Sequence, residues 1–168
     1  MKHSGIRRFI NHLFSAPWHA KRHFSQPVLS RIEAVIAESE RTHNGEIRFV
    51  VESDLHPLHL LRKVTPRQRA LDLFSQLRIW DTADNNGVLI YLLLADRDVE
   101  IIADRGIHQH IGQQGWEEIC REMETAFRNG KFEEGVLHGI RRITAALKKY
   151  FPYTDDDKNE LPAAPVLL

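Results

Sequence analysis

Apolar residues follow two different spacings along the chain, and each spacing predicts one kind of element. Helical spacing, with apolar residues three and four positions apart, runs through 6–14, 27–43, 66–80, 112–128 and 132–151. Alternating or continuous apolar runs, which are typical of strands, cover 46–53, 87–95 and 98–103. The run from Val88 to Leu94 is apolar on both faces, so we expect a central strand with helices on each side.

The order of these elements predicts the fold class. A strand, a helix and a second strand in succession form a crossover connection, which makes the strands at 46–53 and 87–95 parallel. The next strand follows after the short turn Asp96-Arg97, so it must run antiparallel to its neighbour. Because helices are expected on both faces, the sequence predicts an α/β protein, a three-layer α/β/α sandwich with a small mixed sheet flanked by helices.

The uneven distribution of charge divides the chain into three parts. Residues 1–24 are basic and contain no acid, 25–153 carry the periodic apolar pattern of a domain, and 154–168 are acidic and contain proline. The last part lacks a periodic apolar face, so we expect it to be disordered. In residues 6–18 an apolar stripe lies beside basic residues. Such a stripe allows peripheral contact with the inner face of a membrane, or with a protein partner there. The alternative is that the stripe packs against the domain or against a partner chain.

Composition excludes several classes of protein. Lys plus Arg and Asp plus Glu each number 23, so the charge balance gives no support for a nucleic-acid partner. No apolar run is long enough to span a bilayer, and the first residues lack the apolar core of a signal peptide. The single cysteine, Cys120, cannot form an internal disulfide and suits a reducing compartment, so we expect a cytoplasmic protein.

Three polar loops are expected to meet at one edge of the sheet. Two of them precede the parallel strands, and the third follows the second strand of the hairpin. Carboxylate and amide oxygens suit calcium or magnesium. The candidate ligands for such a divalent cation, the first two being the main ones, are Asp84, Asp104, Asp81, Asn85 and Glu46. The alternative is that the residues before the second strand only form a turn.

The same edge offers groups that bind anions. A helix expected to begin near Gly112, together with Arg105, His108 and His110, would hold a phosphate group. With a metal at the carboxylates, this arrangement predicts hydrolysis of phosphate esters, with His108 as the candidate catalytic acid or base. If His108 and His110 both took part, a transition metal would replace calcium or magnesium. The familiar nucleophile, nucleotide and zinc motifs are missing from the sequence.

Several motifs resemble one protein family. Asn86-Gly87-Val88-Leu89-Ile90 and, after the strand, Asp96-Arg97-Asp98-Val99-Glu100-Ile101 resemble the core of the TPM domain family. Gly45-Glu46-Ile47 resembles the start of that family's first strand, and Phe132 to Val136 resembles the start of its last helix. The resemblance covers about 28–150. It implies an α/β/α sandwich, divalent-ion binding in some members and a phosphatase activity proposed for plant members.

The chain departs from this family pattern in three places. Asn85 stands where the family has an acid, Asp104 where it usually has glycine, and His108 where it usually has an acid. We therefore expect a divalent-cation-binding accessory or interaction module, associated with a membrane assembly. The alternatives are a metal-dependent phosphatase that hydrolyses phosphate esters and a non-enzymatic scaffold.

Overall fold

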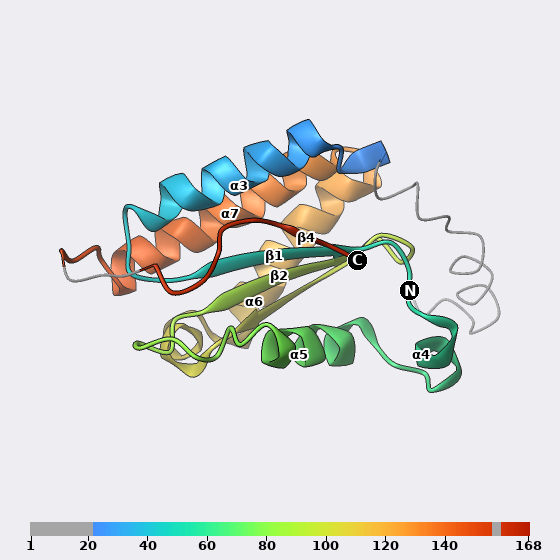
Figure 1. Cartoon of the computed structure of the whole chain (residues 1–168), viewed down its shortest axis with the longest axis horizontal. Coiled ribbons are helices and arrows are strands. Elements are labelled where there is room, and N and C mark those ends of the chain that lie inside the picture. Colours follow the sequence, from blue (N-terminus) through green and yellow to red (C-terminus); the bar gives the residue numbers. More distant parts are fainter. Residues whose placement is uncertain (1–21, 156–158) are drawn as a thin grey trace.

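A four-stranded mixed sheet lies between two layers of helices in the computed structural model (Figure 1). The structure describes residues 22–155 and 159–168. The strands are β1 (Ile47–Glu52), β2 (Val88–Leu93), β3 (Asp98–Ala103) and β4 (Val166–Leu167). The helices are α3 (Gln26–Glu40), α4 (Pro57–Leu61), α5 (Pro66–Gln76), α6 (Arg105–Arg128) and α7 (Phe132–Tyr150). This architecture confirms the predicted three-layer α/β/α sandwich.

The order of strands across the sheet is β3-β2-β1-β4. β1 and β2 are parallel, with Ile47 opposite Val88, as the crossover through α5 predicts. β2 and β3 form the expected antiparallel hairpin, with Leu93 opposite Asp98. The parallel strands therefore begin at the end of the sheet where β3 finishes, on the left in Figure 1, and their carboxyl ends lie on the right.

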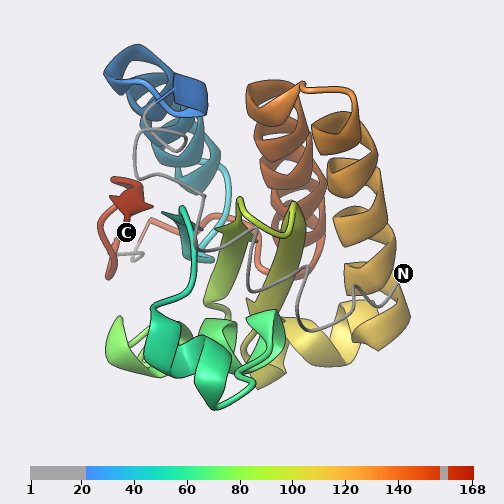
Figure 2. The ribbon, with the colours of Figure 1, turned by 90° about the vertical axis from the view of Figure 1, so that its right-hand side faces the viewer.

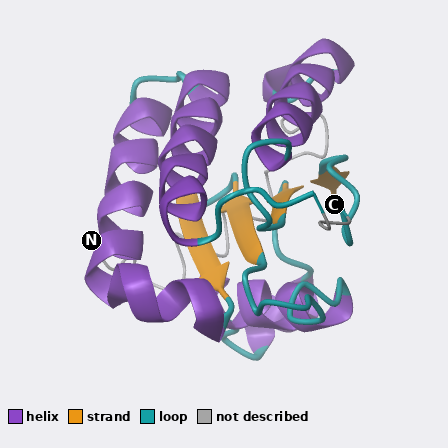
Figure 3. Ribbon diagram, turned by 90° about the vertical axis from the view of Figure 1, so that its left-hand side faces the viewer, coloured by secondary structure: helices purple, strands orange, loops and turns teal. Residues whose placement is uncertain are grey.

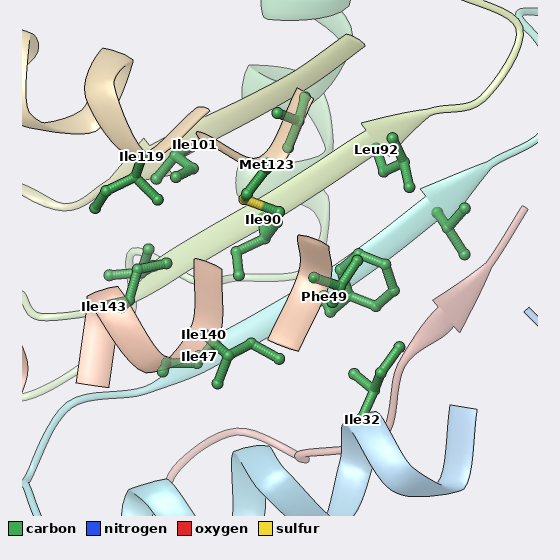
Figure 4. Close-up of a cluster of buried hydrophobic side chains, with 14 of the residues drawn as sticks. Ile32, Ile47, Phe49, Ile90, Leu92, Ile101, Ile119, Met123, Ile140 and Ile143 are labelled. Atoms are coloured by element: carbon green, nitrogen blue, oxygen red, sulfur yellow. The ribbon is translucent and has the colours of Figure 1, made fainter. Parts of the chain in front are cut away.

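The central strand β2 contributes side chains to both helical layers, because successive residues of a strand point to opposite faces. Ile90 and Leu92 pack with residues of α3, α6 and α7, among them Ile32, Met123 and Ile140 (Figure 4). The alternate residues of β2 pack against α5 on the other face. This two-sided burial explains why the sequence of β2 is apolar throughout.

Helix α6 begins earlier than the sequence predicts. Asp104 precedes its first turn, and the Asp104 carboxylate accepts a hydrogen bond from the backbone N–H of Arg105 at 2.6 Å. Gly112 lies inside the helix and interrupts it with a φ of 69°, a conformation that glycine adopts readily. The predicted helix start near Gly112 is therefore confirmed for the second, longer part of α6, which follows this kink. The sequence analysis missed the shorter helical part before the kink, which begins at Arg105.

The prediction of disorder for 154–168 was wrong for the described residues 159–168. β4 pairs in parallel with β1, and the Leu168 N–H donates to Val51 O at 2.9 Å. Leu161 and Val166 also pack against the buried apolar side chains that lie between α5 and the sheet. The segment covers the outer edge of β1, so its backbone groups gain partners that its own sequence pattern does not reveal.

The first 21 residues lie outside the part of the chain that the structure describes. The predicted helix at 6–14 and the predicted membrane contact through 6–18 therefore stay predictions. Pro27 lies in the first turn of α3, as its sequence position predicts. Within the described ranges, no helix is both long enough and apolar enough to cross a membrane.

Candidate functional site

The three predicted loops meet at the end of the sheet where β1 and β2 begin (Figure 3). The Asn86 side-chain amide donates to Asn44 O at 2.8 Å and joins the first two loops. The Gly106 N–H donates to Asn85 O at 2.9 Å and joins the second loop to the start of α6. We call these segments, 44–46, 81–87 and 104–106, the loop edge.

Gly106 allows the second loop to approach α6 closely. A Cβ atom at this position would lie 2.5 Å from both Asp84 O and Asn85 O. Asn85 has a positive φ of 52°, a left-handed conformation that asparagine tolerates better than most residues. The carbonyl oxygens of the loop therefore face the first turn of α6.

Two buried oxygens at the loop edge, Asp104 Oδ2 and Asn86 Oδ1, have no hydrogen-bond partner among the described residues. Asp104 Oδ1 accepts from the Arg105 N–H, so only half of this carboxylate is used. The Asn86 side chain is 1% exposed, and its nitrogen is already committed to Asn44. An unsatisfied buried polar group costs about 1–3 kcal/mol, so a ligand that satisfied these oxygens would be bound favourably.

The predicted ligands Asp81, Asp84 and Asn85 lie in different surroundings. Asp81 and Asp84 have exposed side chains. Asn85 Oδ1 accepts a hydrogen bond from Arg105 Nε at 3.1 Å. Across 22–155 and 159–168, no group of three or more His, Cys, Asp or Glu side chains is placed to hold a metal ion. A cation at the loop edge would therefore need amide or carbonyl oxygens as well as carboxylates.

The fifth predicted ligand, Glu46, binds the C-terminal segment. Glu46 is 3% exposed, and its two carboxylate oxygens accept from the backbone N–H groups of Glu160 and Leu161 at 2.7 and 3.2 Å. The Glu160 carboxylate in turn accepts from the Ala83 N–H at 3.0 Å. The C-terminal segment thus lies against the loop edge and uses both Glu46 oxygens.

The two predicted metal-binding histidines do not share a site. Both lie in α6, where residues two positions apart point in different directions. The His110 ring stacks on Tyr150 of α7, with centroids 4.3 Å apart and an interplanar angle of 11°. His108 follows Asp104 by one helical turn, and its N–H donates to Asp104 O at 2.9 Å. The idea of an extended His-x-His pair was therefore wrong.

Glu40 is a buried acid near the loop edge that sequence reasoning missed. Its Oε1 accepts from the Ile47 N–H at 3.2 Å, and its Oε2 accepts from the Asn159 side chain at 3.1 Å. Burial raises the pKa of Glu40 to about 7, while the hydrogen bond from Ile47 opposes the shift. Glu40 follows Ile32 and Ile36 at intervals of one helical turn, and this spacing on an apolar face was the available signal.

Neither Ser39 nor Cys120 is an activated nucleophile. His43 Nδ1 accepts from the Gly45 N–H at 3.1 Å, so the ring proton lies on Nε2, 2.9 Å from Ser39 Oγ. His43 therefore donates to Ser39 instead of removing its proton, and burial lowers the pKa of His43 to about 4. Burial also raises the pKa of Cys120 to about 12, so its thiol stays protonated at neutral pH.

Comparison with known proteins identifies one family to which the chain is similar. The family model for the TPM domain matches residues 21–146. No curated protein matches the chain. Among solved structures, the chain resembles the BA42 protein of the psychrophilic bacterium Bizionia argentinensis, with 30% identity and a TM-score of 0.75. That match covers 86% of this chain and 94% of BA42.

A second solved structure supports the fold alone. The N-terminal domain of a P. gingivalis protein is 19% identical, has a TM-score of 0.57, and the match covers 72% of this chain and 76% of that one.

The family model spans most of the chain and includes the motifs around Asn86 and Phe132. The chain therefore belongs to the TPM domain family.

Proposed function

We propose that this TPM domain binds a hard divalent cation, calcium or magnesium, at the loop edge, and that its role is accessory and not catalytic. The observation that carries the proposal is the buried Asp104 Oδ2, which lacks a hydrogen-bond partner within the described part of the chain. A buried carboxylate oxygen without a donor is stabilised by a cation. Calcium and magnesium both prefer oxygen ligands.

Neighbouring groups would supply the remaining oxygens. Asn86 Oδ1 is buried and lacks a partner within 22–155 and 159–168, and Asp84 offers an exposed carboxylate on the same loop. Calcium sites combine carboxylates with amide and backbone carbonyl oxygens, and the carbonyls of Asp84 and Asn85 face the start of α6. His110 would not join this site, because its ring is stacked against α7.

A metal-dependent phosphatase is the alternative, and the surroundings of α6 disfavour it. Asp104 caps the first turn of α6, before the kink at Gly112, so its negative charge disfavours a phosphate group at this end of the helix. Arg105, the neighbouring cation, donates to the Asn85 side chain. The role of His108 as a catalytic acid or base stays a prediction.

The test is an amide-shift titration of the full chain with calcium, magnesium, zinc and nickel in turn. Calcium or magnesium should produce saturable shifts in the amides of 84–86 and 104–106. Asp104→Asn retains a residue that caps helices well but removes the charge. This variant should weaken calcium binding at least about tenfold, equivalent to about 1.4 kcal/mol.

The matched control is Asp72→Asn, which removes an exposed carboxylate from α5 and should leave the calcium affinity unchanged. If none of the four cations produced saturable shifts at the loop edge, the proposed site would be refuted. A tighter response to zinc or nickel than to calcium would contradict the assignment of a hard cation. Turnover of a generic phosphate ester that is lost in Asp84→Ala and Asp104→Ala would favour the phosphatase.

A further inference from the structure

Figure 2 faces the end of the molecule at which β1 and β2 finish. A pocket lies beyond the carboxyl ends of these two strands, at the opposite end of the sheet from the loop edge. Its volume is about 210 Å³. Ser53 follows β1 and Ala95 follows β2; both line the pocket, and the Ala95 N–H donates to Ser53 O at 3.1 Å. In open α/β folds, ligands bind preferentially beyond the carboxyl ends of strands. We call this cavity the carboxyl-end pocket.

The charged side chains that line the carboxyl-end pocket are basic. Arg22 and Arg97 contribute to its wall with His23, and no acid lines it among the residues that the structure describes. Asp54 and Asp96 are close in sequence but do not line the pocket. Guanidinium groups bind carboxylate and phosphate oxygens through paired hydrogen bonds. The lining therefore favours an oxyanion over a cation.

The inner wall of the pocket is held in place by aromatic packing. Phe132 is 7% exposed and stacks on Phe127 with ring centroids 5.4 Å apart. The His23 ring lies 4.3 Å from the Phe132 ring. Ser53 is equally buried and adds a polar side chain to this wall. A wall that is already packed costs little further ordering when a ligand binds.

Arg97 has an unusual backbone conformation at the pocket. It closes the hairpin turn, where its N–H donates to Leu94 O at 3.1 Å, and its φ is 52°. Glycine or asparagine suits such a left-handed position, and most other residues cost about 1–2 kcal/mol there. The turn therefore carries a cationic side chain where a neutral residue would be more stable.

We propose that the carboxyl-end pocket binds a small molecule through a phosphate or carboxylate group. Arg22 and Arg97 provide the charged contacts, and Ser53 provides a hydroxyl. The volume of about 210 Å³ accommodates one such group and a short part of the molecule that carries it. The site does not depend on the cation at the loop edge, because the two lie at opposite ends of β1 and β2.

Two parallel titrations of the full chain test this site, one with inorganic phosphate and one with acetate, at constant pH and ionic strength. Phosphate or acetate should produce saturable shifts in the amides of Ser53, Ala95 and Arg97. The anion that binds more tightly, phosphate or acetate, identifies the group through which the ligand is held. Arg97→Asn should weaken that binding about tenfold while leaving the fold at least as stable, since asparagine suits a positive φ.

Arg78→Asn is the matched control, because Arg78 also has a positive φ, 53°, and an exposed side chain, yet does not line the pocket. It removes the same charge and relieves the same backbone conformation, so the anion affinity should stay unchanged. Arg22→Gln should weaken binding in the same way as Arg97→Asn. Shifts that do not saturate, or equal weakening in the Arg97 and Arg78 variants, would overturn the proposal.

Discussion

Two carboxylates at opposite ends of the sheet, Asp104 and Glu52, differ in the partners that the protein gives them. Where the parallel strands begin, Asp104 and Asn86 each keep one buried oxygen without a partner among the described residues. At the other end, Glu52 accepts from Arg69 Nε and Nη2 at 3.0 and 2.9 Å, and from the Tyr91 hydroxyl at 2.6 Å. Burial alone therefore does not mark a binding site. A carboxylate paired inside the protein stabilises the fold, whereas an unpaired oxygen can still bind a ligand.

The two ends also differ in the charge that they present. Asp84 and Asp104 lie at the loop edge, whereas Arg22 and Arg97 line the carboxyl-end pocket. Strand β1 has six residues, which span roughly 20 Å at about 3.3 Å per residue. A metal ion at one end is therefore too far from an oxyanion at the other to polarise it. The two proposed sites are therefore too far apart to form one hydrolytic centre.

Removing the internal partner of Glu52 is expected to have the largest effect on stability. Arg69→Met leaves the Glu52 carboxylate with the Tyr91 hydroxyl alone, and breaking a buried ion pair costs about 3–5 kcal/mol. Urea denaturation at neutral pH measures the loss. Arg67→Met, in the same helix, removes a half-exposed partner of Glu100 and a hydrogen bond to Ile101 O, and should cost less, about 1–2 kcal/mol. Equal losses of stability in the two variants would mean that the buried ion pair stabilises the fold no more than the half-exposed pair does.

Most of the fold could be predicted from the sequence because its elements repeat an apolar pattern. The run from Val88 to Leu94 marked the central strand, and the crossover rule gave its direction relative to β1. β4 could not be found in this way. It contains two residues, and its position depends on backbone groups of β1 and on Glu46, which are distant in sequence.

The loop edge depends on a close backbone approach, and Gly106→Ala should disturb it. The new Cβ would meet two backbone carbonyls at 2.5 Å, so the loop must shift, at a cost of about 1–3 kcal/mol. The shift should also weaken calcium binding. Gly115→Ala in the same helix would meet only the Ile111 side chain, and alanine favours helices by about 1 kcal/mol over glycine. Thermal unfolding measures the stability of both variants. Equal stability of Gly106→Ala and Gly115→Ala would show that the loop is not held against α6.

The site was less predictable than the fold, for reasons that particular residues show. Asp104 could be selected because it directly follows β3 at the edge where the loops meet. Asn86 looked like an ordinary turn residue, because the sequence does not show that its side chain is buried. Glu46 was selected for its position, but its contacts with 160–161 depend on a segment without a predicted structure. Partners distant in sequence therefore decide which carboxylates stay available.

The smallest expected effect is a change in the pH dependence of stability at the end where β1 begins. Burial raises the pKa of Glu40 from 4.5 to about 7, so its contribution to stability is present below about pH 4.5 and is lost as the pH rises through 7. Burial lowers the pKa of His43 from 6.5 to about 4, so stability falls as the pH drops through this range. The two slopes oppose each other, each at most about 1.4 kcal/mol per pH unit.

Glu40→Gln removes the dependence of stability on pH that comes from Glu40 and leaves the dependence that comes from His43. The free energy of unfolding of this variant should rise by about 1–2 kcal/mol between pH 4.5 and 6.5, a steeper rise than in the parent chain. Urea unfolding at several pH values measures the difference. Glu38→Gln, on the exposed side of α3, should retain the parent profile. Burial also raises the pKa of Glu100, which acts in the same direction as Glu40, so part of the opposing slope persists in both variants. Parallel profiles for Glu40→Gln and Glu38→Gln would mean that Glu40 ionises as an exposed acid does, and that the C-terminal segment does not bury it.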